Sequence, residues 1–223
     1  MMQTTENKEH KGNTMAKVKK NVKTKVGKLK YIFIEGEGRN QAMEGNEPRM
    51  MYVASIVADK GSDIIKHMEA QCMEVWDEYK TANGLKPASK PDTIGIKVVK
   101  DPESGAETDE RLITFKTDVA WPDGNKKEIK VLDPKGTDIT KAVHSAPWSI
   151  GNDSEGIIHG VAEGNNTGGK HKVSLYLSAV QLAKLVKYEG AAVEAEEIEG
   201  ADDLDLGDDL YSAIGDGDQS PEL

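Results

Sequence analysis

The charged residues of this chain are distributed unevenly, and their distribution limits which part of the chain can fold. From Ala191 to Leu223 there are 12 Asp and Glu residues and no Lys or Arg, whereas residues 1–190 hold 29 basic and 27 acidic side chains. A block of like charges repels itself and buries too little apolar surface to offset the entropy lost on ordering. The sequence therefore predicts a disordered acidic tail over residues 191–223.

The other end of the chain is basic. Residues 1–30 hold nine lysines, against Glu6 and Glu9 alone. Blocks of one charge are often segments that contact a partner of the opposite charge. We expect residues 1–25 to form a flexible basic segment and residues 26–190 to form one domain, which is long enough for a substantial core.

Residues 26–190 combine short strand-like runs with one helix. Between Ser62 and Ala82 the apolar positions Ile65, Met68, Cys72 and Tyr79 recur every three or four residues, which predicts an amphipathic helix with Ser62 as its N-cap. Val180, Leu182, Leu185 and Val186 suggest a short closing helix. Six or seven strands are expected, in the runs "KLKYIFIEGEG", "PRMMYVASIVAD", "TIGIKVVK", "RLITFKTDVAW", "KEIKVLD", "GIIHGVA" and "HKVSLYLSAV".

Because strands and helices do not alternate one for one, this order favours a mainly β fold. The expected architecture is an OB-fold-like small barrel with an inserted amphipathic helix. The stretch "GNNTGGKH" resembles a phosphate-binding loop up to Lys170, but His171 stands where such a loop needs Ser or Thr and a strand follows. It is interpreted as a hairpin loop.

Several classes of protein are disfavoured. No apolar run approaches the roughly 20 residues that span a bilayer, and the first residues lack the apolar centre of a signal peptide. The single cysteine, Cys72, excludes an internal disulfide and a cysteine-based zinc cluster. We expect a cytoplasmic protein with no metal site and no membrane contact.

Basic and aromatic residues gather in the middle of the chain. Bases stack on aromatic rings while lysines follow the phosphates, and neither contact reads sequence. Taken singly, each of these aromatic residues is better explained as a core residue, and it is the arrangement together with the acidic tail that favours DNA binding. The candidate DNA-binding residues are Lys97, Lys100, Phe115, Lys116, Trp121, Lys126, Lys127, Lys130, Lys135, Lys141 and Trp148.

An enzymatic alternative remains at this level. Asp92, Glu128 and Lys130 follow the order of acids and lysine seen in many magnesium-dependent nucleases, where carboxylates hold the metal and a lysine steadies the attacking water. An acidic residue two positions before a lysine on a strand more often belongs to a solvent-exposed face of that strand. The nuclease is therefore the second hypothesis.

Several stretches resemble the phage-encoded single-stranded DNA-binding proteins that have an OB fold and an acidic C-terminal tail. They are "SIVADKGSDIIKHMEAQCMEVWDEY", "ITFKTDVAWPDG", the glycine-rich stretch before "KVSLYLSAVQLAKLVKYEG", and the tail after Glu189. The resemblance implies a five-stranded barrel with a helix, cooperative binding of single strands and no cofactor. It also implies that the tail contacts a phage DNA polymerase, helicase or exonuclease, and it leaves a homo-oligomer open.

The tail carries apolar side chains among its acids, which solubility alone would not require. We expect Asp208, Asp209, Leu210 and Tyr211 to contact partner proteins, and the acidic run to compete with DNA for a basic groove. Some members of the resembled family end on an aromatic residue, whereas this chain ends on Leu223. Tyr211 and Leu210 are the substitutes available for that anchor, and a solubilising appendage is the alternative role.

Overall fold

The computed structural model describes residues 15–42 and 45–189. The predicted disordered tail and most of the predicted basic segment lie outside these residues. Strands predominate in the described part, which confirms the predicted mainly β class. The elements are β1 (Val18–Lys23), β2 (Gly27–Phe33), β3 (Arg39–Asn40), β4 (Met50–Asp59), α1 (Asp63–Ala82), β5 (Ile96–Lys100), β6 (Glu107–Asp118), β7 (Lys130–Leu132), α2 (Thr140–His144), β8 (Ser149–Ile150), β9 (Glu155–Thr167), β10 (Lys170–Lys184) and β11 (Lys187–Tyr188).

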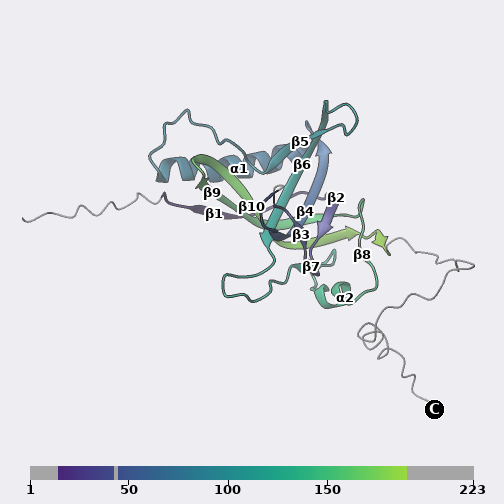
Figure 1. Ribbon diagram of the computed structural model, residues 1–223. Coiled ribbons are helices and arrows are strands. Elements are labelled where there is room, and N and C mark those ends of the chain that lie inside the picture. Colours follow the sequence, from purple (N-terminus) through teal and green to yellow (C-terminus); the bar gives the residue numbers. More distant parts are fainter. Residues whose placement is uncertain (1–14, 43–44, 190–223) are drawn as a thin grey trace, which may run out of the picture. The chain divides into compact units, whose positions relative to one another are not determined.

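One curved sheet forms the body, in the order β5-β6-β4-β2-β9-β10-β7, with β1 paired to β9 and β3 paired to β4 (Figure 1). Neighbouring strands are antiparallel except for β10 and β7. A parallel bridge between Thr93 and Lys172 joins the segment before β5 to β10, and β10 lies beside β6. The sheet thus curls into the partly open, OB-fold-like barrel that the sequence predicts.

The core fills the inside of this sheet because alternate residues of each strand face inward. Tyr52, Ile56, Ile113 and Phe115 of β4 and β6 are almost completely buried there. Helix α1 adds a second apolar layer through its own buried face, as the spacing predicts. That face consists of Ile65, Met68, Cys72, Val75, Trp76 and Tyr79.

Two features tie α1 to the chain around it. The Ser62 side chain accepts a hydrogen bond from the Ile65 N–H at 3.4 Å, which confirms the predicted N-cap. Gly164 of β9 lies against the helix, and a Cβ there would stand 2.6 Å from Cβ of Tyr79. Only glycine allows the helix to approach the strand this closely.

Two expectations about the ends of the domain are wrong. The predicted start at residue 26 is too late, because Val18–Lys23 form β1 and pair with β9 from Gly164 to His159. The predicted closing helix does not form. Val180 and Leu182 are inward positions of β10, which continues to Lys184, and β9 offers a partner along this whole length. Strand pairing therefore overrides the local helical spacing.

The connections also differ from expectation in part. The stretch at Gly164–His171 is a β9–β10 hairpin, as predicted, with Gly168 and Gly169 at positive φ. The short helix α2 between β7 and β8 was not predicted. Within residues 15–42 and 45–189 no helix combines the length and apolarity needed to cross a membrane.

Candidate nucleic-acid interface

A cleft of about 330 Å³ lies on the outer face of β4 and β6. It follows from strand periodicity, since Leu112, Thr114 and Lys116 of β6 alternate with the inward Ile113 and Phe115. The residues that line it come from five strands and from the turn after β3. They are Tyr31, Arg39, Gln41, Val53, Ser55, Lys97, Leu112, Thr114 and Lys116.

Positive charge is concentrated in this cleft. The pKa of Lys116 is lowered, first because partial burial removes water from its ammonium and then because Lys97, Arg39 and Arg49 repel it. Its Nζ donates a hydrogen bond to Oε1 of Gln41. None of the described residues that line the cleft is acidic. An anion bound here would relieve this repulsion.

Two arginines stand at the edge of the cleft. The guanidinium of Arg49 donates from Nε to Oδ1 of Asp118 at 3.0 Å and from Nη2 to Oδ2 at 3.3 Å. The guanidinium of Arg39 lies 5.0 Å from the centre of the Phe33 ring. Both side chains are held in place while their remaining N–H donors stay available to a ligand.

A β-bulge brings an aromatic ring to the same cleft. Pairing of β2 with β4 shifts register between Lys30 and Phe33, and Tyr31 within the bulge has a φ of +53°. The Tyr31 N–H donates to Oδ1 of Asn152 at 3.0 Å, and the side chain is 48% exposed. Bulges of this kind redirect a side chain, and strained backbone is concentrated at functional sites. Tyr31 is thus presented to a ligand.

A second exposed aromatic ring follows β6. Trp121 is 58% exposed, and Nζ of Lys127 lies 4.6 Å from the centre of its ring. Trp121 is five residues after Lys116, so the two Cα atoms are at most about 18 Å apart. Lys126 and Lys127 also line a separate pocket of about 640 Å³ between the β2–β3 turn and α2.

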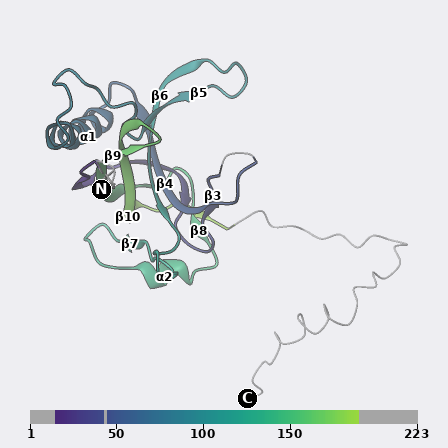
Figure 2. The ribbon, with the colours of Figure 1, turned by 60° about the vertical axis from the view of Figure 1, so that its left-hand side comes forward.

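The structure distributes the predicted DNA-binding residues over several places. Lys97 and Lys116 line the cleft, Lys100 ends β5, and Trp121, Lys126 and Lys127 lie on the loop after β6. Lys130, Lys135 and Lys141 belong to the β7–α2 segment, which lies at the opposite end of the body from the β5–β6 hairpin in both views (Figures 1 and 2). These three lysines are not among the residues that line the cleft.

The aromatic candidates differ in how far their rings are exposed. Phe115 is wrong as a stacking residue, because its side chain is 0% exposed and faces the core. Trp148 is half-buried against the core, and Nζ of Lys187 lies 5.0 Å from its ring centre. Only Trp121 presents a largely exposed indole near β6.

The three residues of the nuclease hypothesis are not brought together. Asp92 exchanges hydrogen bonds with His171, near the start of β10, whereas Lys130 pairs with Ala179 of the same strand. Eight residues of strand separate these two positions, or about 26 Å. Lys130 contacts Asp138 at 3.7 Å, and the described residues contain no group of three potential metal ligands. This arrangement does not form a two-carboxylate metal site.

Sequence reasoning missed three residues that line the cleft and one at its edge. Tyr31, Arg39, Gln41 and Arg49 lie on β2 and on the connection to β4, far in sequence from the lysines of β5 and β6. A usable signal was present in "KYIFIEGEGR", where an aromatic strand runs into glycines followed by an arginine. Loops of this kind carry binding residues on rigid scaffolds.

The predicted partner-binding residues Asp208, Asp209, Leu210 and Tyr211 lie outside the described residues.

No family model and no curated protein matches the chain. Solved structures do match. The single-stranded DNA-binding protein of bacteriophage Enc34, in complex with single-stranded DNA, has a TM-score of 0.51 and 15% identity over 76% of this chain and 89% of that one. A C-terminal truncation of the same protein has a TM-score of 0.51 and 16% identity over 75% and 87%.

A further match is gp2.5, a single-stranded DNA-binding protein encoded by bacteriophage T7. Its TM-score is 0.49, with 19% identity over 80% of this chain and 98% of that chain. At these identities the matches establish a shared fold. That fold is the one the sequence resemblance implies, with the Enc34 structures carrying the comparison.

Proposed function

We propose that this protein binds single-stranded DNA without sequence preference, in the cleft on the outer face of β4 and β6. The observation that carries the proposal is the environment of Lys116. Three further cations act on it, and no acid is found among the described lining residues. Phosphates are the natural partners of such a cluster, because each contact also releases counterions from the nucleic acid.

The chemistry of the cleft favours a single strand over a duplex. Tyr31 and Trp121 expose aromatic faces on which unpaired bases can stack, and every base has such a face. In OB folds the outer face of the second and third barrel strands binds oligonucleotides. β4 and β6 occupy that position here, since they follow β2 in the barrel. The Enc34 protein with the same fold is described in complex with single-stranded DNA, which supports the assignment.

We assign the protein a role in phage DNA replication or recombination, in the cytoplasm of an infected cell. Its tail supplies the second part of this proposal. The 12 acids after residue 190 compete with DNA for the cleft, and the apolar residues among them contact a polymerase, helicase or exonuclease. No enzymatic step is assigned to the protein itself.

A salt titration on matched single-stranded and duplex oligonucleotides tests the function. Neutralising four to six phosphates should give a logarithmic salt slope of roughly −3 to −4 for single strands, and affinity for duplex should be weaker. Equal affinity for both forms, or binding independent of salt, would rule the proposal out. Recovery of intact DNA after incubation with magnesium checks the absence of a nuclease.

A further inference from the structure

The outer surface of β10, β9 and β1 continues from the cleft. β10 lies beside β6 and pairs with β9, which in turn pairs with β1. β10 contacts β6 without pairing to it, and two strand spacings of about 4.8 Å separate β10 from β1, or about 10 Å. Phosphates follow each other at about 3.4 Å along a B-form strand, so at most about three nucleotides would cross from β10 to β1.

Tyr176 of β10 stands in the middle of this crossing. Leu175 and Leu177 on either side face the core, so the Tyr176 ring faces outward and is 37% exposed. Its pKa is raised, first by partial burial, then by the nearby carboxylate of Glu163 and more weakly by Asp118. Lys19 and Arg49 act on it in the opposite direction. Tyr176 pairs with Val161 of β9, which pairs with Asn21 of β1, so Tyr176 is two residues along the sheet from the Lys19–Glu163 pair.

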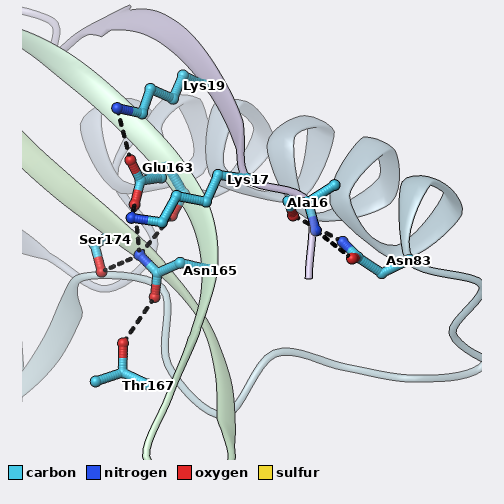
Figure 3. Close-up of polar contacts among 8 residues, drawn as sticks. All are labelled: Ala16, Lys17, Lys19, Asn83, Glu163, Asn165, Thr167 and Ser174. Atoms are coloured by element: carbon cyan, nitrogen blue, oxygen red, sulfur yellow. Dashed lines mark hydrogen bonds and ion pairs between the residues drawn. The ribbon is translucent and has the colours of Figure 1, made fainter. Parts of the chain in front are cut away.

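Lys19 of β1 and Lys17, which directly precedes β1, share the buried carboxylate of Glu163 (Figure 3). Nζ of Lys19 lies 3.0 Å from Oε2 of Glu163, and Nζ of Lys17 lies 3.4 Å from Oε1. Asn165 Nδ2 adds a hydrogen bond to Oε1 at 3.3 Å. Glu163 is 3% exposed, whereas the side chains of Lys17 and Lys19 are 65% and 61% exposed.

This arrangement prepares the lysines for an anion. An ammonium group has three donors, so each lysine retains donors after contacting Glu163. Two positive charges against one negative charge leave a net positive charge on this surface. Because the carboxylate already restricts both side chains, less conformational entropy is lost when a phosphate binds.

We infer that bound single-stranded DNA continues from the cleft across β10, with a base stacked on Tyr176 and a phosphate held by Lys17 and Lys19. This inference rests on the proposed function and adds a second contact surface to it. The cleft and this surface together define a strand path around one side of the barrel. The β7–α2 lysines lie off that path.

Oligothymidylates of two lengths test the inference in the full chain by fluorescence anisotropy. Site sizes of OB folds range from about 4 to 16 nucleotides, so dT4 samples the cleft and dT16 samples both surfaces. Tyr176→Leu should weaken dT16 binding about 5- to 100-fold and leave dT4 binding unchanged. Lys17→Gln, which keeps the Lys19–Glu163 pair, should reduce the salt slope for dT16 by about 0.7.

Matched controls are available on the same body. Lys20→Gln removes an equal charge from β1, but Lys20 contacts Glu74 and Glu78 of α1. Tyr188→Leu removes the same kind of ring from β11, where the tyrosine is 60% exposed. Both controls should match the unsubstituted protein on dT16.

The outcomes separate the two proposals. If the unsubstituted protein does not prefer single strands, the proposed function fails. If it does, and Tyr176→Leu and Lys17→Gln bind dT16 as the unsubstituted protein does, the second surface alone is refuted. A loss of equal size on dT4 and dT16 also refutes it. Photocrosslinking of an oligonucleotide containing 5-iodouracil, followed by mass spectrometry, should recover Tyr176 in the adduct.

Discussion

Lys127 fixes the position of Trp121 on the loop after β6. Its Nζ lies 4.6 Å from the centre of the indole and donates to Oγ1 of Thr117 at 3.0 Å. Thr117 faces the core side of β6, so the lysine connects the exposed ring to the body of the barrel. The indole is therefore an ordered, exposed surface on the loop after β6, and it costs little further entropy to stack on a base.

Trp121→Ala should weaken binding of single-stranded DNA by about 1 to 3 kcal/mol, because a stacked base loses its aromatic partner. The melting temperature should stay nearly unchanged, since the ring is 58% exposed. Anisotropy and thermal denaturation on one preparation measure both quantities. Trp148→Ala is the control, because that ring packs against the core and its loss should lower stability instead. The opposite pattern for the two tryptophans would contradict the assignment.

Lys116→Met should bind single-stranded DNA more weakly, by about 1 to 2 kcal/mol, and should unfold at a higher temperature. The pKa of Lys116 is lowered in the folded protein, by partial burial and by Lys97, Arg39 and Arg49. Its charge therefore destabilises the fold at neutral pH, and this penalty disappears as pH rises through the ordinary lysine pKa of 10.5. The stability advantage of the variant should shrink in the same range. Denaturant titrations at pH 7 and above pH 10 measure the free energy of unfolding of both proteins. A difference between them that stays the same at both pH values would contradict the explanation.

Phe115→Ala should reduce the free energy of unfolding by about 3 to 5 kcal/mol, because a fully buried ring leaves a cavity. The ring contacts a tight part of the barrel, since a Cβ on Gly160 would lie 2.6 Å from Cδ1 of Phe115. Urea denaturation measures the loss. Without urea, and at a temperature where the variant stays folded, its DNA affinity should be close to that of the unsubstituted chain. A large loss of affinity with normal stability would return Phe115 to the DNA-contacting residues.

Removal of residues 191–223 should tighten binding of single-stranded DNA, because the 12 acids no longer compete for the cleft. The gain should be several-fold at low salt and should shrink as salt screens the competing contact. Anisotropy titrations of both forms at two salt concentrations measure it. Identical affinities at every salt would leave the tail a solubilising appendage, and weaker binding by the shortened form would contradict competition. Loss of binding to a partner polymerase or exonuclease is the matching expectation for recruitment.

Sequence patterns were sufficient wherever the determining contacts are local. The spacing from Ile65 to Tyr79 and the Ser62 cap predicted α1, because both act within a few residues. The alternation in β4 and β6 predicted strands for the same reason. Lys97 and Lys116 were candidates because they lie on predicted strands where basic and aromatic residues gather, and both line the cleft.

Tertiary contacts decided the remainder, because a strand's partner and a side chain's surroundings depend on residues far away in the sequence. Pairing with β9 brought Val18–Lys23 into the sheet and extended β10 through Val180 and Leu182, against their local spacing. The bulge at Tyr31 and the convergence of Arg39 with Lys116 depend on β4, because β2, β3 and β6 all pair with it. The sequence by itself determined a mainly β chain with basic and acidic ends. Strand alternation gives each strand two faces, and long-range pairing decides which face becomes the inner one. The curl of the sheet therefore decided which face of the barrel carries the positive charge and which aromatic rings are buried.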